Sequence, residues 1–182
     1  MKSLKLWIAV MLGTLAAGWD RLTKSPLALP NELGTFNEHG IESQIIDPAS
    51  ANLPVSSRYL LYTRGATGTG YVDLCGAATL PLGASSDSPY QIGDIVNIRR
   101  LGARPGLELG IPATAFTVDD LVLTAANGKI QTFNAVANGT YYIVGRCAKT
   151  VPNTGDNIEV PYVPCTPIKI TVNAGVGTIV VA

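Results

Sequence analysis

Apolar residues near the N-terminus recur at steps of three and four positions. They are Leu4, Ile8, Met11, Leu15, Trp19 and Leu22. This spacing places side chains on one face of an α-helix, and the Ser25-Pro26 pair is a signal that ends it. We therefore predict a helix over residues 1–24 whose apolar face docks on another protein. The basic start and the uncharged run from Leu6 to Trp19 also fit a secretory signal peptide, which is the alternative interpretation.

The next segment, residues 25–57, has a different composition. It is interrupted by Pro26, Pro30, Pro48 and Pro54, and its acidic residues are Glu32, Glu38, Glu42 and Asp47. No lysine or arginine lies among them, whereas the preceding segment is mainly basic. We predict an extended, proline-punctuated arm that lies across a neighbouring subunit; the alternative is a partly ordered leader.

Beyond Ser57 the pattern changes to the period of β-strands, with alternation in Tyr71–Cys75 and Gly93–Ile98. Two Asn-Gly dipeptides, Asn127-Gly128 and Asn138-Gly139, stand between strand-like runs, which predicts tight turns with positive φ and an antiparallel meander. The last residues predict two more strands. We therefore expect an all-β fold over residues 58–182, a small antiparallel β-barrel or sandwich preceded by the helix and the arm.

One phrase occurs twice within this region. Leu82-Gly83 is followed ten positions later by Gly93-Asp94, and Val144-Gly145 is followed at the same interval by Gly155-Asp156. Glycine supplies turn dihedrals and aspartate hydrogen-bonds its own backbone in turns. We predict one supersecondary unit used twice, with turns at Gly83, Gly93, Asp94, Gly145, Gly155 and Asp156. A catalytic role for the two aspartates is the less favoured alternative. The stretch Pro161–Pro167 is expected to be a rigid connector between strands.

The composition leaves little room for catalysis. The chain has one histidine, thirteen basic and thirteen acidic residues, and 14% charged residues. A zero net charge argues against nucleic-acid binding, which needs a basic excess. A single histidine provides no metal-binding pair and little scope for a Ser-His or Cys-His nucleophile. Cys75, Cys147 and Cys165 lack metal spacing and are expected to be reduced thiols, with one disulfide and a spare thiol as the alternative. We expect no enzyme activity, no catalytic residues, no metal and no cofactor.

Several phrases occur in a fixed order along the chain. They are Leu-Gly-Ala-Ser-Ser-Asp (82–87), Gly-Asp-Ile-Val-Asn-Ile (93–98), the run 116–130, Ile-Val-Gly-Arg-Cys-Ala (143–148) and Gly-Asp-Asn-Ile-Glu-Val (155–160). In this order the chain resembles the capsid cement, or decoration, proteins of tailed bacteriophages over about residues 58–172. It departs from them at Asp119-Asp120, where such proteins commonly have Gly-Asp, and in its N-terminal arm.

The resemblance implies a virion structural protein, made in the host cytoplasm, that binds the outer surface of a phage capsid and stabilises it by bridging subunits. Its expected partners are the major capsid protein and further copies of itself, as a dimer or trimer, with no nucleic acid and no membrane. The alternative is a secreted or surface β-domain, adhesin-like or carbohydrate-binding, exported by the N-terminal segment.

The residues expected to dock on the capsid fall into two groups. The first is the apolar set of the N-terminal helix: Leu4, Trp7, Ile8, Met11, Leu15, Trp19 and Leu22. The second is the basic cluster Arg99, Arg100 and Arg104, which could pair with acidic groups of a capsid subunit. Unpaired, solvated arginines are the alternative for this cluster.

Overall fold

The computed structural model describes residues 40–50, 57–86, 91–103, 105–173 and 176–179. The helix predicted over residues 1–24, its docking residues and the arm as far as residue 39 lie outside this part of the chain. The described residues belong to a single unit, which spans Gly34–Ala182. They form strands, turns and two short 3-10 helices, so the predicted all-β class is confirmed.

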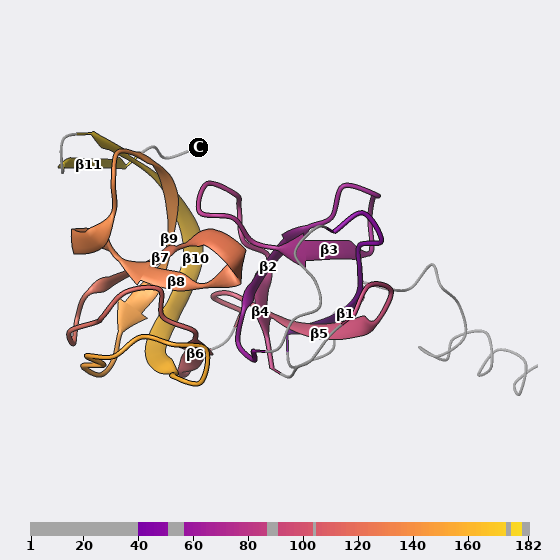
Figure 1. Ribbon diagram of the computed structural model, residues 1–182, viewed down its shortest axis with the longest axis horizontal. Helices are drawn as coiled ribbons and strands as arrows, with labels where there is room; N and C mark the ends of the chain where they lie inside the picture. The colour runs from indigo at the N-terminus through magenta and orange to yellow at the C-terminus, as the bar shows by residue number, and fades with distance from the viewer. Residues whose placement is uncertain (1–39, 51–56, 87–90, 104, 174–175, 180–182) are drawn as a thin grey trace, which may run out of the picture. The chain divides into compact units, whose positions relative to one another are not determined.

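The first sheet is a closed barrel. Its strands are β1 (Ile41–Ile46), β2 (Leu61–Arg64), β3 (Tyr71–Leu74), β4 (Gly83–Ser85) and β5 (Ile95–Arg100). Their order is β1-β3-β2-β4-β5, and β5 returns to pair with β1 (Figure 1). Every pairing is antiparallel except the short parallel contact of β1 with β3.

Strand β1 corrects the prediction that residues 25–57 form an arm outside the β-domain. Its residues alternate, with Glu42, Gln44 and Ile46 buried, whereas Ile41 and Ile45 are partly exposed. The apolar residues thus occupy both faces and two polar residues point inward. The sequence pattern therefore does not predict β1, because a half-buried strand is normally identified by apolar residues that alternate with outward polar ones.

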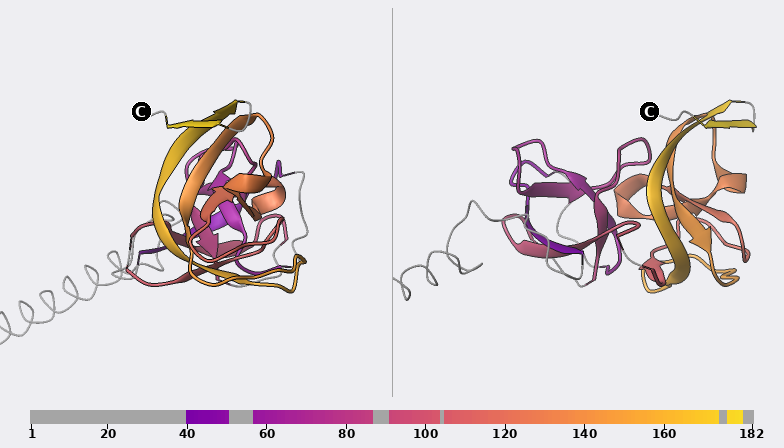
Figure 2. Two further views of the ribbon diagram at one scale, coloured as in Figure 1. Left: turned by 90° about the vertical axis from the view of Figure 1, so that its left-hand side faces the viewer. Right: turned by 180° about the vertical axis from the view of Figure 1, so that it is seen from behind.

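The second sheet follows in the chain. Its strands are β6 (Glu108–Gly110), β7 (Leu121–Thr124), β8 (Ile130–Thr132), β9 (Gly139–Cys147), β10 (Val160–Asn173) and β11 (Val176–Ile179). Their order is β11-β10-β9-β7-β8, with β6 paired to the start of β10, and all pairings are antiparallel. Strand β10 curves strongly along its length (Figure 2), and its register with β9 shifts between Pro164 and Ile168. The predicted connector Pro161–Pro167 is therefore part of a strand.

The two Asn-Gly dipeptides have different roles. Asn127 and Gly128 have φ of 58° and 71° and lie in the 3-10 helix η2 (Ala126–Gly128), which joins the antiparallel strands β7 and β8. After β8 the chain continues through a second 3-10 helix, η3 (Phe133–Ala135), and β9 pairs with β7 and β10. Gly139 opens β9 with a nearly extended φ of 159°. The predicted meander is therefore wrong at its second turn.

The sequence phrase that occurs twice is not a pair of turns in either copy, because its first glycine lies inside a strand. Gly93 and Gly155 have positive φ in turns, and Asp94 accepts a hydrogen bond from the Gln91 N–H at 2.8 Å. Gly83 and Gly145, however, lie inside β4 and β9. A Cβ on Gly83 would lie 2.2 Å from the Arg99 carbonyl oxygen, and one on Gly145 would lie 2.3 Å from that of Val163. In both copies glycine allows the next strand to pass close to the backbone.

One apolar core joins the two sheets. The barrel contributes Leu61, Cys75 and Ala84, and the second sheet contributes Val122, Ile130, Val144, Cys147, Val160 and Tyr162, with Leu101 and Phe116 from the connecting segments. The turn at Gly128 reaches the barrel directly, because its N–H donates to the Cys75 carbonyl at 2.7 Å. Two further clusters fill the barrel interior and the far end of the second sheet.

A buried carboxylate fixes the end of β1. Asp47 is 1% exposed and accepts hydrogen bonds from the Ala49 N–H at 2.9 Å, the Thr67 N–H at 2.9 Å and the Thr67 hydroxyl. The two hydrogen bonds from Thr67 stabilise the ionised carboxylate and are the main reason why the pKa of Asp47 lies below its usual value. The carboxylate therefore ties the loop after β2 to the loop after β1.

We expect Gly128→Ala to lower the free energy of unfolding by at least about 1 kcal/mol. The new Cβ would lie 2.7 Å from the Leu61 carbonyl oxygen, at a residue with φ of 71°. Gly76→Ala is the matched control, because its Cβ would be 3.4 Å from the nearest atom, Thr79 Oγ1. Urea unfolding of both variants measures the difference. Equal stability of the two variants would show that the Gly128 contact is misplaced.

We expect Asp47→Asn to destabilise the protein at neutral pH, because an amide nitrogen would face a backbone donor. The Asp47 pKa is lowered in the folded state from 3.8, so the carboxylate stabilises the fold above about pH 4. This contribution disappears as pH falls through the folded-state pKa. Melting temperatures measured from pH 7 to pH 2 should converge for the two proteins in acid. A constant difference over the whole range would contradict the role of the ionised carboxylate.

Candidate docking face

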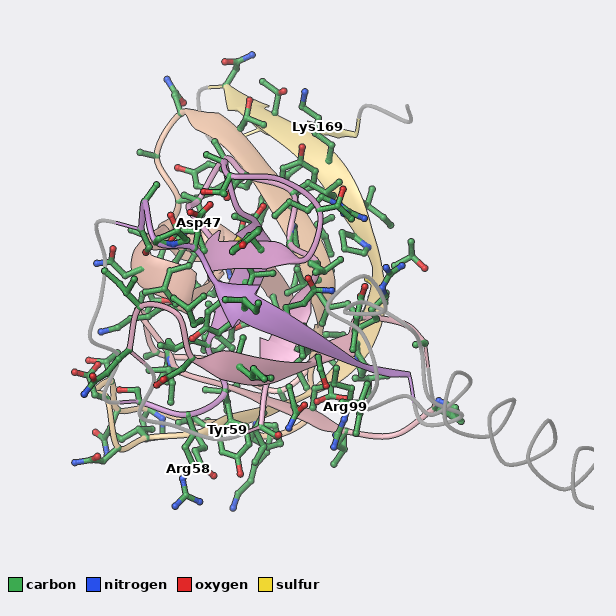
Figure 3. All side chains as sticks on the ribbon, turned by 90° about the vertical axis from the view of Figure 1, so that its right-hand side faces the viewer. Asp47, Arg58, Tyr59, Arg99 and Lys169 are labelled. Carbon is green, nitrogen blue, oxygen red and sulfur yellow. The ribbon has the colours of Figure 1, made fainter. Side chains whose placement is uncertain are left out.

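The outward side of β1 and β5 is the candidate functional site. This docking face consists of Ile41, Ser43 and Ile45 from β1 and Ile95, Asn97 and Arg99 from β5, the positions that alternate with the inward residues of each strand. The register places them opposite one another, as Ile41 with Arg99, Ser43 with Asn97 and Ile45 with Ile95. Figure 3 looks onto the barrel from the side of β1, with Arg99 and Asp47 toward opposite ends of that strand.

The docking face has isoleucines at both ends, and Arg99 lies opposite Ile41 at one of them. Ile95 is 60% exposed, and Ile92, just before β5, is 50% exposed. In the middle, the Ser43 hydroxyl donates to Asn97 Oδ1 at 2.9 Å. Arg99 is the one charged residue among the six. A surface with exposed isoleucines and little charge is typical of a protein–protein contact.

The inward residues of the same strands hold the docking face in place. Val96 and Ile98 are fully buried in the barrel core. Glu42, with a side chain only 6% exposed, accepts a hydrogen bond from Arg100 Nε at 2.9 Å. Because side chains alternate along a strand, this inward pairing dictates which residues of β1 and β5 face outward.

The structure separates the three arginines predicted to dock on a capsid. Arg100 points inward and is engaged by Glu42. Arg99 lies on the docking face, where its Nη1 is 3.2 Å and 3.3 Å from the two carboxylate oxygens of Glu108 in β6. Arg104 lies outside the described residues. Arg99 is thus the arginine of this cluster that lies on the docking face, opposite the partly exposed Ile41.

Sequence reasoning missed the isoleucines of the docking face. Ile41 and Ile45 stand in a segment whose prolines and acidic residues indicate an arm, and Ile95 lies in Gly93–Ile98, for which the sequence predicts only a strand. The available signal was that Ile-Glu-Ser-Gln-Ile-Ile (41–46) and Ile-Val-Asn-Ile (95–98) both have apolar residues at odd and at even positions, which places apolar side chains on both faces of each strand. Other exposed large apolar residues, such as Leu80, Leu107 and Val118, belong to loops elsewhere.

The described residues offer no cluster of three or more His, Cys, Asp or Glu side chains that could hold a metal ion. The three cysteines are free thiols, and burial raises the pKa of Cys75 to about 11. A thiol with this pKa is protonated at neutral pH and is a poor nucleophile. None of the helices in the described ranges could serve as a membrane span.

Comparisons with known proteins do not assign this chain to a family. No protein-family model matches the sequence, and no curated protein matches it. Among solved structures, the N base of head fiber gp8.5 of bacteriophage phi29 is similar over 69% of this chain and 95% of that chain. The sequence identity is 15% and the TM-score is 0.46, values too low for this similarity to indicate a function.

We expect the two neighbouring arginines to respond differently to substitution. Arg100→Gln removes a partner of the buried Glu42 and should cost about 2 kcal/mol of stability. Arg99→Gln, whose side chain is 39% exposed, should cost less than about 1 kcal/mol. Chemical unfolding of both variants provides the test. Equal losses would mean that the inward and outward assignment is wrong.

Proposed function

We propose that this protein is a phage virion structural protein that binds the outside of the capsid through the docking face and the N-terminal segment. The observation that carries the proposal is the exposed, nearly uncharged face that begins at Ile41 and includes Ile95. It is supported by the resemblance of the strand and turn phrases to capsid cement proteins, described above.

The docking face and the N-terminal segment are contiguous in sequence. Residues 1–39 lead directly to Gly40 and β1, whose first residue is on the docking face. A partner that holds the predicted apolar helix would therefore have to lie within the reach of residues 25–39 from the start of β1. We propose that one capsid subunit contacts the docking face and that a neighbouring subunit receives the helix.

The energetics favour such a bridge. Full burial of an isoleucine contributes roughly 1.5–3 kcal/mol relative to exposure in water. Ile92 and Ile95 are half exposed or more and would contribute a part of this. A protein that binds the assembled shell but not its free subunits would stabilise the shell by mass action. Engagement of two subunits by one molecule would add avidity.

The test compares variants for binding to purified shells that lack this protein. Ile95→Lys should reduce binding at least about tenfold, because a charge would be placed in an apolar contact. Val118→Lys is the matched control, since Val118 is 50% exposed but lies before β7, outside the docking face. A protein lacking residues 1–39 keeps β1 intact and should bind more weakly than the full chain. Each variant should first be shown to unfold cooperatively.

Shell stability provides the second readout. Shells with bound protein should release their contents at a higher temperature than bare shells, in proportion to occupancy. Ile95→Lys should fail to protect, and Val118→Lys should protect fully. Equal robustness of decorated and bare shells would contradict the cementing role. Failure to bind shells, together with cleavage of the N-terminal segment on export, would favour the alternative of a secreted or surface β-domain.

A further inference from the structure

Strand β11 is an edge strand of the second sheet. It pairs with β10 alone in the described part of the chain, through Ile170 with Ile179, Thr171 with Thr178, Val172 with Gly177 and Asn173 with Val176. Its four residues, Val-Gly-Thr-Ile, include no charge and no proline. Proteins normally protect an edge strand with charged residues or proline, or cover it with another segment.

Other sheet edges in the described residues are closed, covered or charged. The first sheet closes on itself and has no border. Strand β8 is covered by the chain before it, because Ala113 N–H donates to the Ile130 carbonyl and Ile130 N–H donates to the Ile111 carbonyl. The short strand β6 carries Glu108, which is paired with Arg99. Strand β11 is thus an edge strand without a charged residue or a proline, and no other described segment pairs with its outer side.

The register identifies the backbone groups that are available at this border. Asn173 and Val176 are paired and have two residues between them, so they form the hydrogen-bonded pair that closes a two-residue hairpin. Hydrogen-bonded and non-hydrogen-bonded pairs alternate along an antiparallel ladder. The backbone groups of Val176 and Thr178 are thus directed to β10. Those of Gly177 and Ile179 are directed away from it.

We propose that β11 pairs antiparallel with β11 of a second copy of this chain, joining the two second sheets into one continuous sheet. A two-fold axis at Thr178 places Gly177 opposite Ile179 of the second copy, and Ile179 opposite Gly177. Each such pair exchanges both of its backbone hydrogen bonds. The two copies thus use the same outward backbone groups, which makes the edge of the strand complementary to itself, as a two-fold interface requires.

This self-association goes beyond the proposed function and does not depend on it. The interface is short, so in solution it would produce a concentration-dependent dimer. On a shell, neighbouring molecules held at the right spacing would have a high effective concentration for each other. Pairing through β11 would then connect the bound copies laterally.

The test uses the full-length protein without shells. Sedimentation velocity over a concentration series should show a monomer–dimer equilibrium. Ile179→Pro removes an outward N–H while leaving the inward donors of Val176 and Thr178, and should raise the dimer dissociation constant at least about tenfold. Ile179→Val keeps the N–H and a β-branched side chain, and should dimerise as the parent does. Circular dichroism and thermal unfolding check that both variants fold.

Amide hydrogen exchange locates the interface. The amides of Gly177 and Ile179 should become protected as the concentration rises, whereas those of Val176 and Thr178 should be protected at every concentration. A protein that stays monomeric, with rapid exchange at Gly177 and Ile179, would overturn the proposal. So would a dimer that Ile179→Pro leaves intact, since its interface would lie elsewhere. Neither result bears on binding to shells, which is measured separately.

Discussion

The contact between Gly128 and the barrel is the constraint on which the rest of this structure depends. The β7–β8 turn can donate to the Cys75 carbonyl at 2.7 Å because Gly128 has φ of 71° and no Cβ. A Cβ there would lie 2.7 Å from the Leu61 carbonyl oxygen in β2. The close approach allows Leu61 and Cys75 to share a core with Val122 and Ile130. Neither sheet has to bury its apolar residues alone.

Glycine serves a related purpose around Tyr162, a fully buried ring in the same core. Cβ atoms on Gly110 and Gly145 would lie 3.3 Å and 2.6 Å from atoms of this ring. The missing side chains in β6 and β9 therefore make the space that the ring occupies between its two neighbouring strands. Dense packing of this kind explains why glycines occur inside strands here, where they would otherwise weaken the sheet.

The sequence predicts those features that depend on residues close together in the chain, such as tight turns. Asn127-Gly128 predicted a hairpin with positive φ because the preference for that turn lies in the dipeptide itself. Asn138-Gly139 has the same composition, yet β9 pairs with β7 and β10 rather than with β8. Strand order depends on which distant residues share a core, and Gly83 and Gly145 are required by the backbone of a strand sixteen or more residues away. No short window of sequence contains that information.

Strand β1 shows most clearly why the docking face escaped prediction and why it is the strongest functional candidate. Glu42 and Gln44 are buried, and Ile41 and Ile45 lie on the outer side beside Arg99 and Ile95. The ion pair of the buried Glu42 with the partly exposed Arg100 contributes little net stability, because the cost of removing the carboxylate from water offsets the attraction. Exposed isoleucines contribute little to folding either, since their apolar surface stays in water. An arrangement with polar residues inside and apolar residues outside is therefore poor for folding alone. It becomes favourable when another protein covers the outer side, because the isoleucines then gain their burial energy at the interface.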